Sequence, residues 1–298
     1  MKNKYFSTKL LFLIFFAIGV TACSSASADQ STLPAKAAAP ETAQKPAEAD
    51  PSGKNVVILS KITIQEGTPS AAIRSFFKAM REKRFVDAMM MTNMKAAVEG
   101  LSLEEIKDLE PDFAPMAAQI PADLVITGEQ ISGDKASVFL RLPGEIPGNP
   151  ATEEMKLRKE ADKWVIISSE NEADEAKAKK QGKAYFFNVR IDMHHLDVEN
   201  MLKQIMQAQS IFSSDGKGQY GERDVLIRQG LLPVDISGSY STGYNFSIVL
   251  SADKKSYFVN AVPAVYGKSG KLSFLMEVTG SGSPKTKSND NGGMPLKK

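Results

Sequence analysis

The chain has 298 residues, of which 42% are hydrophobic and 24% are charged, a composition typical of globular protein and a length that fits about two domains. The first 22 residues hold three of the 37 basic groups and none of the 35 acidic groups, which leaves 34 basic groups against 35 acidic ones. This balance lacks the positive excess that binds phosphate backbones, so we expect no nucleic-acid partner. The single cysteine, Cys23, excludes an internal disulfide and a thiolate metal cluster.

Residues 1–22 have the three parts of a secretion signal: a basic start, an apolar middle and small residues at the end. As a helix, the apolar run 10–22 would be about 20 Å long. A hydrocarbon core is about 30 Å thick, so this run is too short for a good permanent span. We therefore expect a signal peptide that is cleaved.

The leader ends in Val20, Thr21, Ala22 and Cys23, which resembles the lipobox of bacterial lipoproteins. In that family the signal is cut before the cysteine, which carries a diacylglycerol and is often acylated further at its new amino group. The resemblance implies lipidation of Cys23 and a place in the cell envelope, with membrane lipid as a partner. Ser24 follows, as in lipoproteins that Gram-negative cells send to the outer membrane. The alternative is an ordinary secretion signal that ends near a cysteine by chance.

Both ends of the mature chain are expected to be disordered. Residues 23–54 form a tether: its stretch 24–53 contains nine alanines and four prolines, with Leu33 as the only large apolar residue. Such a segment cannot bury enough surface to offset the entropy of ordering. The tail, residues 281–298, is rich in glycine, serine and lysine and is expected to be loose for the same reason.

Residues 55–170 are expected to form a first α+β domain. Thr68 and Pro69 mark the start of a helix whose apolar face carries Ile73, Phe76, Phe77 and Met80. A second helix is expected at 85–91, and a third begins at the capping box 102–105 and ends before Pro111. The expected strands are 56–64 before these helices and 123–131, 135–142, 152–160 and 163–169 after them. Helices followed by antiparallel strands indicate an α+β fold.

This first domain resembles the nuclear-transport-factor-like fold, a cone common in small bacterial lipoproteins. The resemblance depends on Pro69, the Phe76–Phe77 pair, and residues 133–136, 157–159 and 163–166. The family includes enzymes and non-enzymatic binding modules built around a concave pocket, so it implies a fold and leaves the function open.

Residues 171–195 are expected to be a charged connector, with a solvated helix at 170–183 and a strand at 184–193. Residues 196–280 are expected to form a second α+β domain. Its first helix carries an apolar face from Val198 to Phe212, and a short helix at 222–229 ends at Gly230. Three antiparallel strands, 244–250, 257–262 and 272–278, complete it.

The second domain resembles the globular head of type IV pilins and pseudopilins. The matching residues include Tyr220, Gly221, Gly243, Tyr244, Phe246, Pro263, Ser273 and Phe274. True pilins begin with an apolar helix that packs the fibre core, whereas this domain follows a charged connector. The resemblance therefore implies a head that docks on related proteins or serves as a structural module, with a pilus or secretion apparatus as its partner.

Two short sequence motifs match known binding or catalytic motifs but lack the surrounding secondary structure that their chemistry requires. The glycine string 216–221 matches a dinucleotide motif, but a helix precedes it where the motif requires a strand. The SxxK string 251–254 lies between two strands, whereas penicillin-recognising enzymes place it at the start of a helix. We therefore expect a flexible loop and a hairpin turn.

Two clusters of residues each permit two interpretations, one structural and one as a metal site. His194 and His195 are adjacent, so they form either a surface junction or, with Asp192 and Asp197, a weak metal site. A second cluster contains four methionines that either pack a core or bind Cu(I) through their thioethers: Met89, Met90, Met91 and Met94.

With its cysteine assigned to lipid and its two histidines adjacent, the chain is poor in catalytic groups. We expect a membrane-anchored, non-catalytic binding or scaffolding protein without a cofactor or a metal. The alternative is a small-ligand receptor or an enzyme that uses a pocket in the first domain, with an inward carboxylate as general base.

Overall fold

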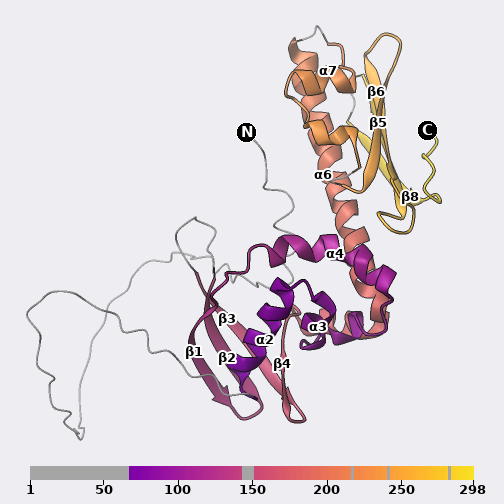
Figure 1. Ribbon diagram of the computed structural model, residues 1–298. Helices are drawn as coiled ribbons and strands as arrows, with labels where there is room; N and C mark the ends of the chain where they lie inside the picture. The colour runs from indigo at the N-terminus through magenta and orange to yellow at the C-terminus, as the bar shows by residue number, and fades with distance from the viewer. Residues whose placement is uncertain (1–66, 143–150, 216–217, 240–241, 281–282) are drawn as a thin grey trace, which may run out of the picture.

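The computed structural model describes residues 67–142, 151–215, 218–239, 242–280 and 283–298. It confirms the α+β class: two four-stranded antiparallel sheets each pack against helices, and one long helix joins the two units (Figure 1). No helix in the described ranges is long and apolar enough to cross a membrane. The expected signal peptide, the lipobox with Cys23, the tether and strand 56–64 lie outside the described residues.

The first unit is three α-helices packed against a sheet of order β1-β2-β3-β4, followed by a further helix. Its elements are α2 (Pro69–Arg81), α3 (Phe85–Met90), η1 (Lys95–Ala97), α4 (Leu103–Ala117), β1 (Val125–Ser132), β2 (Lys135–Leu142), β3 (Ala151–Glu160), β4 (Lys163–Ile166) and α5 (Glu172–Gln181). Helix α2 begins as predicted, because the Thr68 hydroxyl accepts a hydrogen bond from the backbone N–H of Ala71 at 3.2 Å. The four strands that follow the helices lie close to their predicted bounds.

Aromatic and methionine side chains fill the core of this unit. The Phe85 and Phe113 rings stack with their centroids 5.4 Å apart. Met89 and Met94 are each 1% exposed and pack the core as predicted, and Met91 packs partly buried against it, whereas Met90 is 45% exposed and lies outside it. The larger side chains of this core include Ile73, Phe76, Phe77, Met80, Phe85, Met89, Met94, Leu109, Phe113, Leu140, Leu157, Tyr185 and Phe186, with Trp164 partly buried against them.

The predicted end of the third helix before Pro111 is wrong. Helix α4 runs on to Ala117 and contains both Pro111 and Pro115. A proline inside a helix costs about 3 kcal/mol, but here continuation buries Phe113 and Ala117 in the core. Burial of apolar surface therefore outweighs the local proline signal.

The predicted strand at 184–193 is also wrong. These residues belong to α6 (Tyr185–Asp215), which follows the short turn η2 (Gly182–Ala184) and runs for 31 residues, or about 46 Å. Tyr185 and Phe186 are buried in the first core, whereas Val198 and the residues after it are buried in the second. The β-favouring residues at the start of α6 are helical because a helix brings them onto the first core.

The second unit packs α6 and α7 (Arg223–Arg228) on one face of a sheet of order β5-β6-β7-β8 (Figure 1). The remaining elements are η3 (Val234–Ser237), β5 (Tyr244–Leu250), β6 (Ser256–Pro263), β7 (Leu272–Thr279) and β8 (Lys285–Asp290). The three predicted strands and the short helix that ends at Gly230 are confirmed. Ser251 and Lys254 lie in the β5–β6 turn, as predicted, where the Ser251 hydroxyl donates to Asp253 at 2.6 Å.

The expectation of a loose tail at 281–298 is wrong for residues 285–290. They form β8, which pairs antiparallel with residues 272–277 of β7. All six side chains of β8 are exposed, so its backbone ladder holds it to the sheet without an apolar pattern. Lysines on such an edge strand also discourage pairing with other chains.

Candidate functional site

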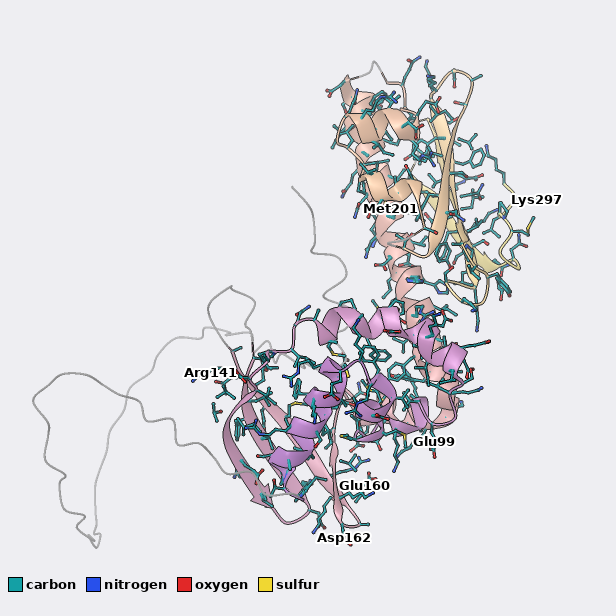
Figure 2. All side chains as sticks on the ribbon, viewed as in Figure 1. Glu99, Arg141, Glu160, Asp162, Met201 and Lys297 are labelled. Atoms are coloured by element: carbon teal, nitrogen blue, oxygen red, sulfur yellow. The ribbon has the colours of Figure 1, made fainter. Side chains whose placement is uncertain are left out.

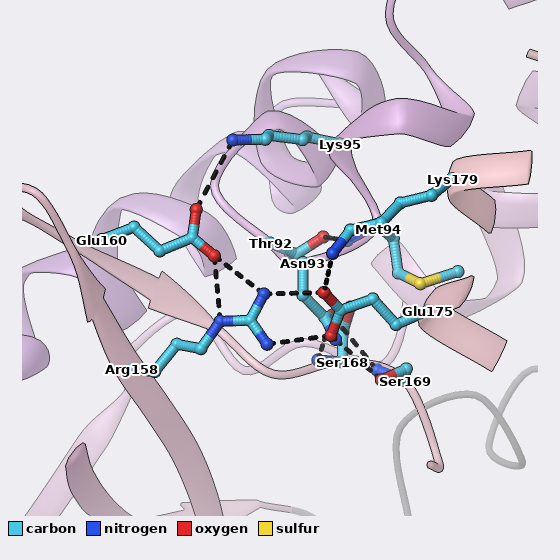
Figure 3. Close-up of polar contacts among 10 residues, drawn as sticks. All are labelled: Thr92, Asn93, Met94, Lys95, Arg158, Glu160, Ser168, Ser169, Glu175 and Lys179. Atoms are coloured by element: carbon cyan, nitrogen blue, oxygen red, sulfur yellow. Dashed lines mark hydrogen bonds and ion pairs between the residues drawn. The ribbon is translucent and has the colours of Figure 1, made fainter. Parts of the chain in front are cut away.

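A buried polar network joins α3, β3 and α5 in the first unit (Figure 3). Asn93, just after α3, is 3% exposed. Its amide nitrogen donates to Ser169 Oγ at 2.7 Å and to Glu175 Oε2 at 2.9 Å, and its oxygen accepts from the backbone N–H of Ser168 at 3.0 Å. Asn93 thus fixes both the segment after β4 and helix α5 to the helical layer.

Arg158 on β3 completes the network with a forked ion pair to Glu175 on α5. Its two terminal nitrogens donate to the two carboxylate oxygens at 2.9 and 2.7 Å, and Lys179 Nζ lies 2.6 Å from the same carboxylate. The hydrogen bonds from Arg158 hold the pKa of Glu175 at about 2. The helix expected at 170–183 is present, but Glu175 is buried at 8% exposure, not solvated as expected.

Glu175→Gln is expected to lower the free energy of unfolding by about 2–3 kcal/mol at pH 7, because Lys179 loses the carboxylate beside it and Arg158 keeps only Glu160 as an anionic partner. In the wild type the folded-state pKa is depressed from 4.5 to about 2. The contribution of the carboxylate is therefore complete above pH 4.5 and is lost as the pH falls toward 2. Urea unfolding between pH 7 and 2.5 should show the difference between wild type and variant shrink over that range. Glu172→Gln, an exposed change on the same helix, is the control, and a difference independent of pH would contradict the assignment.

A second cluster of charged groups lies where α4, α6 and the loop between β6 and β7 meet. Arg190 on α6 places its guanidinium 2.7 Å from the Asp112 carboxylate and donates to the backbone oxygen of Asp108 at 2.7 Å. Lys268, from the loop of the second unit, lies 3.6 Å from the Asp108 carboxylate. Burial raises the pKa of Asp112 above its ordinary value, although Arg190 opposes this shift. These contacts join the two units beside the helix that they share.

The histidine pair belongs to the same junction. His194 Nδ1 lies 2.7 Å from the carbonyl oxygen of Ser269, so this nitrogen carries the proton and donates it. His195 Nε2 accepts from the backbone N–H groups of Lys271 and Leu272 at 3.3 and 3.4 Å. Burial lowers the pKa of His195, because it disfavours the charged ring. The two histidines therefore lie at a half-buried junction between the units, and the described part of the chain holds no group of three or more His, Cys, Asp or Glu that could hold a metal.

Three of the pilin-like residues gather around these histidines. Gly243 has a φ of 67° and lies directly against the His194 ring, where a Cβ atom would collide with it. The Tyr244 and Phe274 rings lie 5.9 Å apart, and both make edge contacts with His195 at 6.2 and 5.8 Å. The aromatic end of the second core therefore packs directly on the junction.

The other pilin-like residues lie elsewhere in the second unit. Gly221 exchanges two hydrogen bonds of 2.8 Å with the fully buried side-chain amide of Gln209, which ties the loop after α6 back to that helix. Tyr220 makes an edge contact with Tyr257, with centroids 4.7 Å apart. The remaining members of the set are Phe246, buried in the core, Pro263, paired with Tyr244, and Ser273, on β7.

The residues that carry both charged clusters could not be recognised in the sequence. Asn93 and Glu175 are 82 residues apart, and Asp112 and Arg190 are 78 apart. No spacing motif connects them, because only the tertiary fold brings them together. The one local signal was the row of glutamates and lysines on α5, which does not distinguish a buried carboxylate from a solvated one.

No protein-family model matches this sequence, and no curated protein matches it. Two solved structures are similar to part of it. One, from Campylobacter jejuni, is described as an NTF2-like transpeptidase; it is 17% identical, covers 34% of this chain and 97% of its own, and has a TM-score of 0.22. The other is a SEC-C motif-containing protein from Rhodopseudomonas palustris, 21% identical over 34% of this chain and 76% of its own, with a TM-score of 0.22. These likenesses assign no family.

Proposed function

We propose that this protein is a lipid-anchored component of the cell envelope that works as a non-catalytic binding or scaffolding module. The observation that carries the proposal is the dual role of α6, which buries side chains in both cores. Two units that share one helix are held at a fixed separation and angle, as a scaffold requires. The lipobox at 20–23 supports the anchor.

The architecture of each unit also supports a more specific fold assignment within this proposal. The first places three helices against a four-stranded antiparallel sheet, in keeping with a nuclear-transport-factor-like fold. The second packs a long helix on an antiparallel sheet, in keeping with a pilin-like head. On this basis we propose a pilus or secretion apparatus as the partner assembly.

The packing of the first unit favours binding at a surface over catalysis in a pocket. Phenylalanine and methionine side chains fill the space between its helices and its sheet. Its buried carboxylate, Glu175, is already held by Arg158, Lys179 and Asn93. A carboxylate held at a low pKa by cations is a poor general base.

Crosslinking in intact cells followed by affinity capture tests the scaffolding role. We expect the same envelope proteins in independent captures of the wild type, enriched over an unrelated lipoprotein that carries the same tag and the same type of anchor. Cys23→Ser should reduce their recovery, because the protein then leaves the membrane surface. Recovery of the protein alone, or of the same set with the unrelated lipoprotein, would contradict the proposal.

A further inference from the structure

The second sheet has an outer face, opposite the one that packs on α6. Tyr257, Val259 and Ala261 of β6 point into the helix-side core, so strand alternation places Phe258 and Asn260 on the outer face. By the same alternation Ser273 and Leu275 of β7 belong to the outer face, because Phe274 and Met276 lie in the core. Ser273 and Leu275 are nevertheless 0% exposed. A further segment must therefore cover this face.

The covering segment is residues 291–298, which we name the strap. At its start the Tyr266 hydroxyl donates to Asp290 at 2.9 Å, and Gly293 lies against Tyr266. At its end Lys298 Nζ lies 3.9 Å from the centroid of the Phe258 ring. Figure 1 shows the C-terminus on the side of the sheet away from α6, and Figure 2 places Lys297 on that side.

The length of the strap fits a path along β7. It begins beside Leu272, which pairs with the last residue of β8, and it ends over Phe258, which pairs with Glu277. Leu272 and Glu277 are five steps apart on one strand, or about 17 Å. An extended chain from Gly293 to Lys298 spans about the same distance. The strap begins with a turn, in which the backbone N–H of Met294 donates to the Asn291 carbonyl oxygen at 3.1 Å and the Asn291 side-chain amide donates to the Pro295 carbonyl oxygen at 3.0 Å. From this turn we infer that the strap passes over the middle of β7 to reach Phe258.

The strap covers this face without satisfying all of its buried polar atoms. Among the described residues, two buried side-chain oxygen atoms have no hydrogen-bond partner, Asn260 Oδ1 and Ser273 Oγ, and both belong to the outer face along this path. A buried polar atom without a hydrogen-bond partner is destabilising, because it has lost its bonds to water and gained none in the protein. The strap thus covers Leu275 but satisfies neither polar atom, which leaves room for a segment that fits better.

Two further features favour exchange of the strap. Gly292 and Gly293, in the turn at the start of the strap, have φ angles of 61° and 79°, so the path of the chain from β8 into the strap depends on a backbone conformation that glycine adopts readily. At its far end Phe258 pairs with Glu277, and an aromatic face beside a carboxylate attracts a cation such as a lysine ammonium. The face therefore selects an extended segment that carries a lysine.

We propose that the outer face of the second sheet is a peptide-binding groove and that the strap occupies it until an extended segment of a partner protein displaces it. Such a partner places a lysine over Phe258 and an apolar side chain over Leu275, and it hydrogen-bonds Asn260 Oδ1 and Ser273 Oγ. This inference rests on the proposed binding role and specifies the surface that performs it.

The probe for this groove is a fluorescein-labelled peptide with the sequence of residues 291–298. Leu296→Asp in the full chain places a carboxylate at a half-buried strap position and should expel the strap. We expect this variant to bind the peptide at least tenfold more tightly than the wild type, whose own strap competes. A peptide with Lys298→Ala should bind the variant two- to fivefold more weakly, since it loses the ring contact. Lys297→Ala in the peptide is the matched control, and a scrambled peptide should not bind.

A chain that ends at Asp290 is a second strap-free form, and circular dichroism checks the fold of both. In the wild type, excess peptide should shift the NMR signals of the Asn260 side-chain amide. Absence of binding to both folded variants, together with unchanged Asn260 signals, would overturn the groove. Equal losses with the Lys297→Ala and Lys298→Ala peptides would also overturn it. Purified protein suffices for these measurements, so their failure would leave the anchoring and the crosslinking results standing.

Discussion

Leu196→Pro is expected to lower the free energy of unfolding by 3 kcal/mol or more and to uncouple the two units. Leu196 lies inside α6, between the residues that enter the first core and those that enter the second. Proline there removes a backbone hydrogen bond and collides with the preceding turn. Urea unfolding should change from one transition to two, and small-angle X-ray scattering should report a broader distribution of distances.

The matched control is Leu196→Ala at the same position. The Leu196 side chain is 51% exposed, and alanine favours a helix, so this change should alter the free energy of unfolding by less than about 1 kcal/mol. If the proline variant unfolded in one transition at the wild-type midpoint, α6 would not couple the two units.

Cys23→Ser is expected to abolish retention at the membrane. Lipid attaches to lipobox proteins through the cysteine sulfur, and a serine hydroxyl does not replace it. The two or three acyl chains of a lipoprotein each contribute about 0.8 kcal/mol per buried CH₂, so their loss should move the protein almost entirely to the soluble fraction. Metabolic labelling with a palmitate analogue and mass spectrometry of the N-terminal peptide measure the modification.

Ser24→Ala is the control for this experiment, since it changes the neighbouring residue and keeps the thiol. This variant should retain its lipid and its membrane association. A Cys23→Ser protein that is processed at the same bond and stays with the membrane would refute the lipobox assignment at 20–23.

Features with a local physical signature could be predicted from the sequence. The strands at 135–142 and 244–250 have the predicted bounds, because alternating side chains in each are followed by turn residues. The helix starts at Thr68 and Ser102 were also predictable, since in both cases the cap hydroxyl bonds to a nearby backbone N–H. These signals depend only on residues a few positions apart.

The errors arose where tertiary contacts decide the conformation. Pro111 is inside a helix because Phe113 is buried by continuing it, and β8 exists because β7 offers it a backbone edge. The candidate site was harder to predict from the sequence than the fold. Asn93, Arg158 and Glu175 lie far apart in the chain and meet only after folding, so no pattern of spacing could have indicated their network.

The number of residues in the shared helix α6 sets the distance and the angle between the two units. Each residue of α6 between the two cores adds 1.5 Å and a rotation of about 100°. Deleting one position there would turn one sheet by more than a quarter of a circle relative to the other and would draw Lys268 away from Asp108. A surface loop tolerates an insertion or a deletion, but the same change within α6 would reorient the whole second unit. The relative orientation of the two sheets therefore depends on the number of residues in this helix.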